Sequence, residues 1–239
     1  MSTAMATSVP DMRERAIIGA QRTGNENESV DRSGRRLLRV TSSPRPGSVT
    51  NELTQAYADA WSASRPGAQV VHHDLPLLDL PHLGAAEMGA WFTDDDDHTD
   101  LHRLVLARSS ALMDDLLAAD ELLIGAPMWN FSIPSNLKAW IDHVTKHGRT
   151  VRFTPQGPMG LVPARRAVVV SARGSDYRPG SPLEPMDLQE PYLRLVLGFL
   201  GIAEVVVVNV DCQGPQFTDA RDHVDDARKH LLAMAVTTS

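Results

Sequence analysis

Short apolar runs alternate with segments of helical periodicity along most of the chain, from about residue 36 onward. Apolar side chains recur at helical spacing between residues 101 and 118, whereas residues 121–125 and 205–210 are almost continuously apolar. The first pattern is typical of helices and the second of buried strands. The predicted strands are residues 37–41, 69–73, 121–125, 167–171 and 205–210. The predicted helices are residues 51–64, 101–118, 134–146, 188–200 and 219–235.

Several helix boundaries carry their own signals. We expect Ser48 or Thr50 to cap the first predicted helix, because hydroxyl side chains accept hydrogen bonds from free N–H groups of a first turn. We expect Ser132 to cap the third, with Pro134 in its first turn, where a missing N–H is tolerated. Residues 75–99 contain two prolines and an acidic run, so we expect that segment to be irregular.

The order of the predicted elements indicates the fold class. Strands that are apolar throughout are buried on both faces, and helical crossovers between them imply a parallel sheet. Five such strands predict an α/β fold with the flavodoxin-like doubly wound order 2-1-3-4-5 and helices on both faces. Ligands of such sheets bind beyond the carboxyl ends of the strands. The informative residues should therefore follow the first, third and fourth strands.

Residues 1–35 differ from the rest of the chain. They are polar, rich in Gly, Ser, Asn and charge, and show no sustained periodicity. We expect either a disordered N-terminal extension or an over-long predicted start there, and a single domain over residues 36–239.

Composition narrows the function classes. A formal net charge of −7 argues against a nucleic-acid partner, which normally selects a basic face. No apolar run reaches the ~20 residues needed to span a bilayer, so we expect no membrane partner. The one cysteine, Cys212, cannot form an intramolecular disulfide, which fits a reducing cytoplasm. We interpret Cys212 as a small side chain at a strand end.

Two other chemistries are less well supported. His98 and His102 stand four residues apart beside acidic residues, as metal ligands can. The segment has no cysteine and is predicted to be irregular, so a solvated loop is the better interpretation and we expect no metal. No serine elbow or Ser/His/Asp order is present, which argues against a hydrolase.

The loop after the first predicted strand, residues 41–51, joins a strand to a helix N-terminus. It offers hydroxyls, a glycine and backbone N–H groups at the positive end of the helix dipole, which suits a phosphate monoester such as that of FMN. It matches neither the nucleoside-triphosphate nor the dinucleotide glycine motif. Its hydroxyls are equally well explained as helix caps.

The loop after the third strand carries Met128, Trp129, Asn130 and Phe131. Leaving the three apolar side chains in water would cost roughly 1.5–3 kcal/mol each, so something should cover them. A flat tricyclic ring would do so, with loop backbone groups reading its polar edge. Core packing explains any one of these aromatic residues; their clustering at a strand end favours a flavin site.

The loop after the fourth strand contains Ala172, Arg173, Gly174 and Ser175. Gly174 would allow a ligand to approach the backbone closely. Arg173 is expected either to offset negative charge on a reduced flavin or to form a surface ion pair.

These segments together resemble a known family. The stretch that carries the resemblance is GAPMWNFSIPSNLKAWIDHV, residues 125–144, followed by GRTVRFTPQGPMGLV, residues 148–162. ARGS at 172–175 and LGFLGI at 197–202 continue it. The chain from about Leu37 onward resembles the FMN-dependent NADH:quinone oxidoreductases and azoreductases.

The resemblance implies a role for each loop. It implies that ribityl phosphate is held by Ser43, Ser48, Val49 and Thr50, the isoalloxazine ring by Met128, Trp129, Asn130 and Phe131, and its pyrimidine side by Ala172, Arg173, Gly174 and Ser175. The first loop is one residue short, and Ala172 and Ser175 stand where the family often has Ser and Gly. Phe153 matches an aromatic near the acceptor pocket, although hairpin packing explains it equally well.

The resemblance also implies the chemistry and the partners. It implies a homodimer with one tightly bound FMN per subunit and ping-pong hydride transfer from NADH to quinones or azo compounds. Because the cofactor carries the chemistry, we expect no protein nucleophile and no obligatory general acid. Two alternatives remain: an NAD(P)H-dependent FMN reductase, in which flavin is a substrate, and a flavodoxin-type electron carrier without enzymatic activity.

Overall fold

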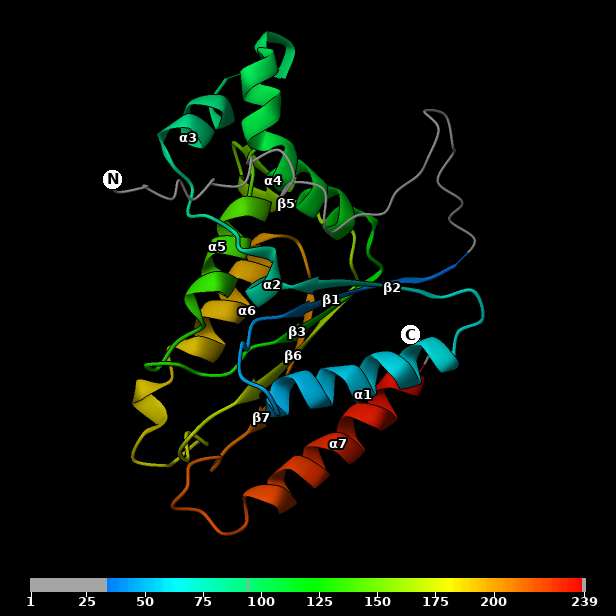
Figure 1. The fold of residues 1–239 in the computed structure, drawn as a ribbon, viewed down its shortest axis with the longest axis vertical. Helices are drawn as coiled ribbons and strands as arrows, with labels where there is room; N and C mark the ends of the chain where they lie inside the picture. The colour runs from blue at the N-terminus through cyan, green and yellow to red at the C-terminus, as the bar shows by residue number, and fades with distance from the viewer. Residues whose placement is uncertain (1–33, 94, 238–239) are drawn as a thin grey trace, which may run out of the picture. The chain divides into compact units, whose positions relative to one another are not determined.

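Five parallel strands form the central sheet, in the order β2-β1-β3-β6-β7 (Figure 1). The computed structural model describes residues 34–93 and 95–237. The strands of the sheet are β1 Arg36–Thr41, β2 Gln69–Asp74, β3 Glu121–Gly125, β6 Arg166–Ala172 and β7 Glu204–Val210. The predicted α/β fold with a five-stranded parallel sheet is therefore confirmed. The expected extension over residues 1–35 lies outside the described residues, apart from positions 34 and 35, and stays a prediction.

Helices cover both faces of the sheet. The helices α1 Val49–Ala63 and α7 Ala220–Val236 lie side by side on one face. The other face carries α4 Asp100–Ala118, α5 Ser135–Val144 and α6 Gln189–Phe199, with the short α2 Leu75–Leu78. No helix in the described part of the chain has the length and apolar character of a membrane span.

The apolar strands supply the core of both layers because successive side chains point to opposite faces. Leu122 and Ile124 of β3 pack with α4, α5 and α6, whereas Leu123 packs with α1 and α7. All three are fully buried. This two-sided burial is the reason that the central strands are continuously apolar in sequence.

One polar side chain of β3 is also buried, at the amino end of the strand. Glu121 accepts hydrogen bonds from Trp61 Nε1 at 3.1 Å and from Arg166 Nη2 at 3.0 Å, and Tyr57 donates to it as well. Burial, reinforced by Glu121, raises the pKa of the Tyr57 hydroxyl. The network is charge-compensated and lies at the sheet edge opposite the predicted site, so we interpret it as structural.

The structure corrects two predictions in this part of the chain. Residues 75–99 are not wholly irregular, since they include α2, α3 Ala85–Trp91 and the 3-10 turn η1 Asp95–Asp97. Ser132 does not cap α5, because Pro134 occupies the N-cap position and Ser132 closes a backbone turn instead. The prediction that Ser48 or Thr50 caps α1 is confirmed for Ser48, whose Oγ accepts from Asn51 N, although the helix begins at Val49.

A two-stranded hairpin lies outside the main sheet. Its antiparallel strands are β4 Val151–Thr154 and β5 Gly157–Gly160. The 3-10 turn η2 Glu184–Met186 precedes α6. Gly160 needs to be glycine, because a Cβ there would meet backbone atoms of Leu200 and Gly201 at 2.1 Å. The hairpin is thereby held against the end of α6.

Candidate functional site

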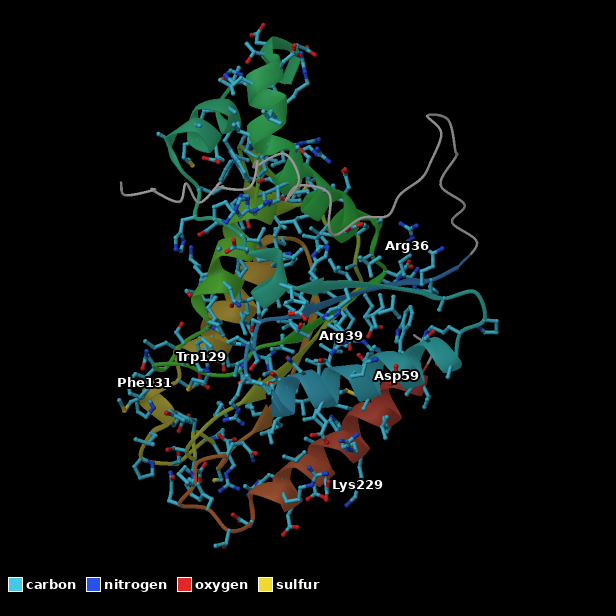
Figure 2. All side chains as sticks on the ribbon, viewed as in Figure 1. Arg36, Arg39, Asp59, Trp129, Phe131 and Lys229 are labelled. Carbon is cyan, nitrogen blue, oxygen red and sulfur yellow. The ribbon has the colours of Figure 1, made fainter. Side chains whose placement is uncertain are left out.

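The three loops singled out by the sequence emerge at one edge of the sheet. Thr41 at the end of β1 pairs with Gly125 at the end of β3, and Gly125 pairs in turn with Val170 of β6. Backbone hydrogen bonds continue this alignment into the loops: Ser42 N donates to Gly125 O at 3.1 Å, and Met128 N to Ala172 O at 2.9 Å. In Figure 2, Trp129 and Phe131 lie toward the opposite end of the strands from Arg36, the first residue of β1.

The first loop forms a cradle of donors at the N-terminus of α1. Ser43, Ser48 and Thr50 are all buried, with 5%, 6% and 0% of their surfaces exposed. The N–H groups of Val49 and Thr50 belong to the first turn, where no carbonyl of the same helix can accept from them. Gly47 has φ of 68°, which lets the loop turn sharply into the helix. Hydroxyls and free N–H groups at a positive helix end are the donors that a phosphate requires.

Two asparagines that the sequence analysis did not single out brace this cradle. Asn51 Nδ2 donates to Ser43 O at 3.2 Å, and Asn136 Nδ2 donates to Ser42 O at 3.0 Å. The Oδ1 atom of each amide is buried and has no hydrogen-bond partner in the described structure. Such acceptors suit the hydroxyls of a ribityl chain, which can donate to them. Asn136 lies on α5, so only the tertiary structure brings it to this loop.

The second loop ends in a strained turn. Trp129 N donates to Ser132 O at 2.9 Å, and Ser132 N donates to Trp129 O at 3.1 Å. The two residues between them have positive φ, 49° for Asn130 and 70° for Phe131. Asparagine tolerates this region, but for a bulky aromatic residue it is unusual and costs on the order of 1–3 kcal/mol. The turn leaves Trp129 44% and Phe131 40% exposed, which is an apolar wall without a cover.

We expect Phe131→Gly to separate the stability of this turn from its binding role. Glycine adopts a φ of 70° without strain, so the free energy of unfolding of the flavin-free protein should stay level or rise by up to about 1 kcal/mol. FMN affinity should fall by roughly tenfold, because the variant loses an apolar side chain that the bound ring would cover. Chemical denaturation and flavin fluorescence titration measure the two quantities. Unchanged FMN affinity in this variant would show that Phe131 does not contact the ring.

In the third loop, Arg173 lies in a buried network of ion pairs, which differs from the prediction. Its guanidinium is 2% exposed and forms ion pairs with Asp187 at 2.6 Å and Asp211 at 2.7 Å. The predicted surface ion pair is therefore wrong, because the pair is buried. Two carboxylates already offset the guanidinium, which argues against the alternative role as a free counter-charge. Arg173 instead joins the loop after β6 to the loop after β7.

Its neighbours in the third loop lie in different surroundings. Gly174 is exposed, and a Cβ built on it would meet no atom within 4 Å. A ligand therefore has room beside its backbone. Ala172 and Ser175 are half-buried, and Ser175 O accepts from Cys212 N at 3.2 Å. Cys212 is buried, and burial raises the pKa of its thiol, which disfavours the reactive thiolate form.

Phe153 lies apart from the edge of the sheet where these loops meet. It stacks on His147 with ring centroids 5.5 Å apart and lines a cavity of about 1040 Å³ together with Trp91 and Phe92. Trp129 lines a different cavity, of about 510 Å³, with Lys138 and Tyr192. Within one chain, then, the structure does not bring Phe153 together with the turn that holds Trp129.

Two histidines that could serve a metal site or a hydrolase, His98 and His143, have other contacts in the described structure. His98 Nε2 lies 3.0 Å from Ala90 O, and the described residues contain no group of three metal-ligating side chains. His143 Nδ1 lies 2.7 Å from Ser109 Oγ, but both side chains are buried and His143 Nε2 contacts Pro81 O at 2.8 Å. This Ser–His pair is inaccessible to a substrate.

Comparison with known proteins identifies the family. A family model described as flavodoxin-like fold matches residues 35–234. An FMN-dependent NADH:quinone oxidoreductase 2 of Pseudomonas fluorescens is 44% identical over 177 residues, which are 74% of this chain and 87% of the relative. The chain belongs to the FMN-dependent NADH:quinone oxidoreductase family. FMN-dependent NADH:quinone oxidoreductase 3 of Pseudomonas aeruginosa is 43% identical over 187 residues, or 77% of this chain and 86% of the relative.

Solved structures agree with this family membership. The azoreductase of Bacillus anthracis strain Sterne superposes with a TM-score of 0.77 and 25% identity, over 84% of this chain and 99% of that one. An FMN-dependent NADH-azoreductase of Bacillus anthracis strain Ames Ancestor, solved in complex with FMN, has a TM-score of 0.75 and 21% identity over 84% and 97% of the two chains. At that identity the second likeness supports the fold alone.

The site of this family member fits FMN. The cradle supplies donors for a phosphate, the two orphaned amide oxygens can accept from ribityl hydroxyls, and the exposed faces of Trp129 and Phe131 need an apolar cover. Gly174 leaves space for the polar edge of a ring. The family relation and these four features point to the same ligand.

Proposed function

We propose that this protein is an FMN-dependent NAD(P)H oxidoreductase that reduces quinones by two electrons and cleaves azo compounds reductively. The observation that carries the proposal is the exposed aromatic turn beside a phosphate cradle at the carboxyl edge of the sheet, in a chain of this family. When bound, FMN would supply the chemistry, a two-electron transfer between the nicotinamide and the acceptor.

The protein's own residues would bind and aim the cofactor. Hydroxyls and first-turn N–H groups would hold the phosphate, from Ser43, Ser48, Val49 and Thr50. The loop after β3 would carry the ring through Met128, Trp129, Asn130 and Phe131. The loop after β6 would border the pyrimidine side of the ring through Ala172, Arg173, Gly174 and Ser175. We expect no side chain to act as a nucleophile or as a metal ligand. Bound in this way, FMN would react in turn with NADH and with the acceptor in one cavity, and ping-pong kinetics are expected.

The assembly and location of the protein also belong to this proposal. We place the enzyme in the cytoplasm as a homodimer, without nucleic-acid or membrane partners. The separation of Phe153 from Trp129 within one chain supports a dimer in which Phe153 reaches an acceptor pocket across the interface. We also equate the strands β2-β1-β3-β6-β7 with the flavodoxin-like order 2-1-3-4-5, the hairpin β4–β5 being an insertion.

Steady-state kinetics test the proposed activity. The purified protein should stay yellow after dialysis and should oxidise NADH or NADPH when benzoquinone or an azo dye is supplied. A parallel-line pattern in double-reciprocal plots is expected for the ping-pong scheme. A protein that loses its flavin on dialysis but reduces free FMN is an FMN reductase. One that keeps its flavin but does not oxidise either nucleotide is an electron carrier. A protein that neither binds flavin nor turns over these substrates would refute the proposal.

A further inference from the structure

Residues 187–189 contact both of the loops that border the proposed ring site. They lie between η2 and the start of α6, more than fifty residues beyond the turn at Trp129 in the chain. Leu188 N donates to Phe131 O at 3.1 Å, and the Asp187 carboxylate pairs with Arg173 at 2.6 Å. We call residues 187–189 the clasp segment.

Gln189 makes the most buried contacts of the clasp segment. The residue is 1% exposed. Its Nε2 donates to Ala126 O at 3.1 Å and to Pro127 O at 3.2 Å, and its Oε1 accepts a hydrogen bond from Ser171 Oγ. One amide therefore joins the end of β6 to the first residues of the loop after β3, residues 126–134, which we call the ring loop. Both its donor and its acceptor functions are used, which fixes the orientation of the amide.

Asp187 in turn holds Gln189 in place. Asp187 Oδ1 accepts from Gln189 N at 2.9 Å and from Glu190 N at 3.1 Å, so it satisfies two free N–H groups of the first turn of α6. Its other oxygen takes the ion pair with Arg173. The rigid first turn of a helix thus presents Gln189 to the two loops.

The contacts of the clasp segment are aimed at the backbone that needs support. Phe131 has a φ of 70°, and strained backbone persists only where the surrounding structure holds it. Leu188 N–H binds the carbonyl of Phe131 itself, and Gln189 binds the carbonyls at the other end of the same loop. Met128 N–H joins the loop to Ala172 between these two points.

We propose that Gln189 is a positioning residue for FMN, which keeps the ring loop and the loop after β6 in register so that both meet the isoalloxazine as one preformed wall. This rests on the proposed function, since it assumes that the two loops border FMN. Gln189 does not touch the reacting atoms; it acts through Ala126, Pro127 and Ser171. A misplacement of about 1 Å at a distance from the chemistry can lower a rate 100-fold, so the orientation of the loop matters.

The test compares Gln189→Leu with Gln69→Leu in the full-length protein. Gln69 is an exposed residue at the start of β2, so the control makes the same chemical change at the opposite end of the strands. Gln189→Leu keeps the size of the side chain but leaves two carbonyls and a hydroxyl without their partner. We expect its FMN dissociation constant, measured by fluorescence titration, to rise about tenfold or more, and that of Gln69→Leu to stay within about twofold.

A second readout separates positioning from mere stability. At saturating FMN, Gln189→Leu should still show a shifted visible absorption band of the bound flavin and a kcat lowered about tenfold, because the ring is held in a different place. A residue that only stabilises the fold would lower the melting temperature and leave both quantities unchanged once FMN is saturating. That second outcome would overturn the proposal.

Ser171→Ala keeps the test decisive if Gln189→Leu does not fold. It removes only the hydroxyl that orients the Gln189 amide. We expect a smaller shift in the same direction, about two- to fivefold in the FMN dissociation constant, and wild-type values for affinity and flavin spectrum would count against the positioning role. If the wild-type protein binds no FMN, the proposed function itself fails; if the wild type binds FMN and the variants match it, only the role of Gln189 fails.

Discussion

Val49→Asp should weaken FMN binding by about 100-fold. A carboxylate about 6 Å from a phosphate costs on the order of 3 kcal/mol at an effective dielectric constant of ~20, which corresponds to roughly two powers of ten in affinity. Val49 is the first residue of α1, at the centre of the proposed cradle. Its backbone N–H would remain, so the loss would come from charge. Flavin fluorescence titration at low ionic strength measures the dissociation constant, and added salt should reduce the loss.

Val49→Asn is the matched control for this charge. Asparagine has nearly the shape of aspartate, so both variants lose the same packing of Val49 against the core beneath α1 and α7. The uncharged variant should bind FMN within about threefold of the wild type, since the N–H donor is kept. In the flavin-free protein Val49→Asp should be the more stable of the two variants, because aspartate at the positive end of a helix adds about 0.3–1 kcal/mol to the free energy of unfolding. Equal affinities in the two variants would place the phosphate elsewhere.

Arg173→Met should lower the free energy of unfolding by about 3–5 kcal/mol. Methionine can occupy much of the same space, but the change leaves the carboxylates of Asp187 and Asp211 without their cation, and removing one partner of a buried ion pair typically has this effect. The loops after β6 and β7 should separate, so FMN retention should fall as well. Urea denaturation of the flavin-free protein measures the stability, and dialysis measures the retention.

Two further variants make the origin of this loss clear. Arg103→Met removes a cation that is exposed, as is its partner Asp100. This variant should change the free energy of unfolding by no more than about 1 kcal/mol. Arg173→Met combined with Asp211→Asn should regain part of the loss, because one uncompensated buried charge is removed. If the single variant Arg173→Met lost less than about 1 kcal/mol, the buried pair would not be formed in solution.

The central strands and most helices could be predicted because their burial is visible in sequence. Strands covered on both faces read as runs such as residues 167–171, and the five predicted strands coincide with those of the sheet to within one or two residues. The short helices of residues 75–99 could not be predicted in the same way. Helices of four and seven residues contain too few turns to show a period. Pro76, one of the two prolines in that segment, suggests a break in sequence although it lies in the first turn of α2.

Some residues of the site could likewise be named from the sequence, and others could not. The loops of the site follow strands, so their residues could be named from sequence, and Ser48 was recognised as a cap by its residue type. The prediction for Ser132 was wrong because a serine two residues before a proline suits both a helix cap and a turn. Pro134 takes the N-cap position, and Ser132 closes the turn with Trp129. Gln189 gives no sequence signal, because a glutamine in an amphipathic helix normally faces solvent.

The sequence by itself determined the fold class, the family and the three loops, since each is written in local apolar patterns and motifs. Only the tertiary structure decided what the polar side chains of those loops do. Arg173 pairs with carboxylates 14 and 38 residues away, and Gln189 binds carbonyls 63 and 62 residues away. The physical reason is that a buried polar group must find a partner wherever the packed fold places one, and distance along the chain does not limit that choice.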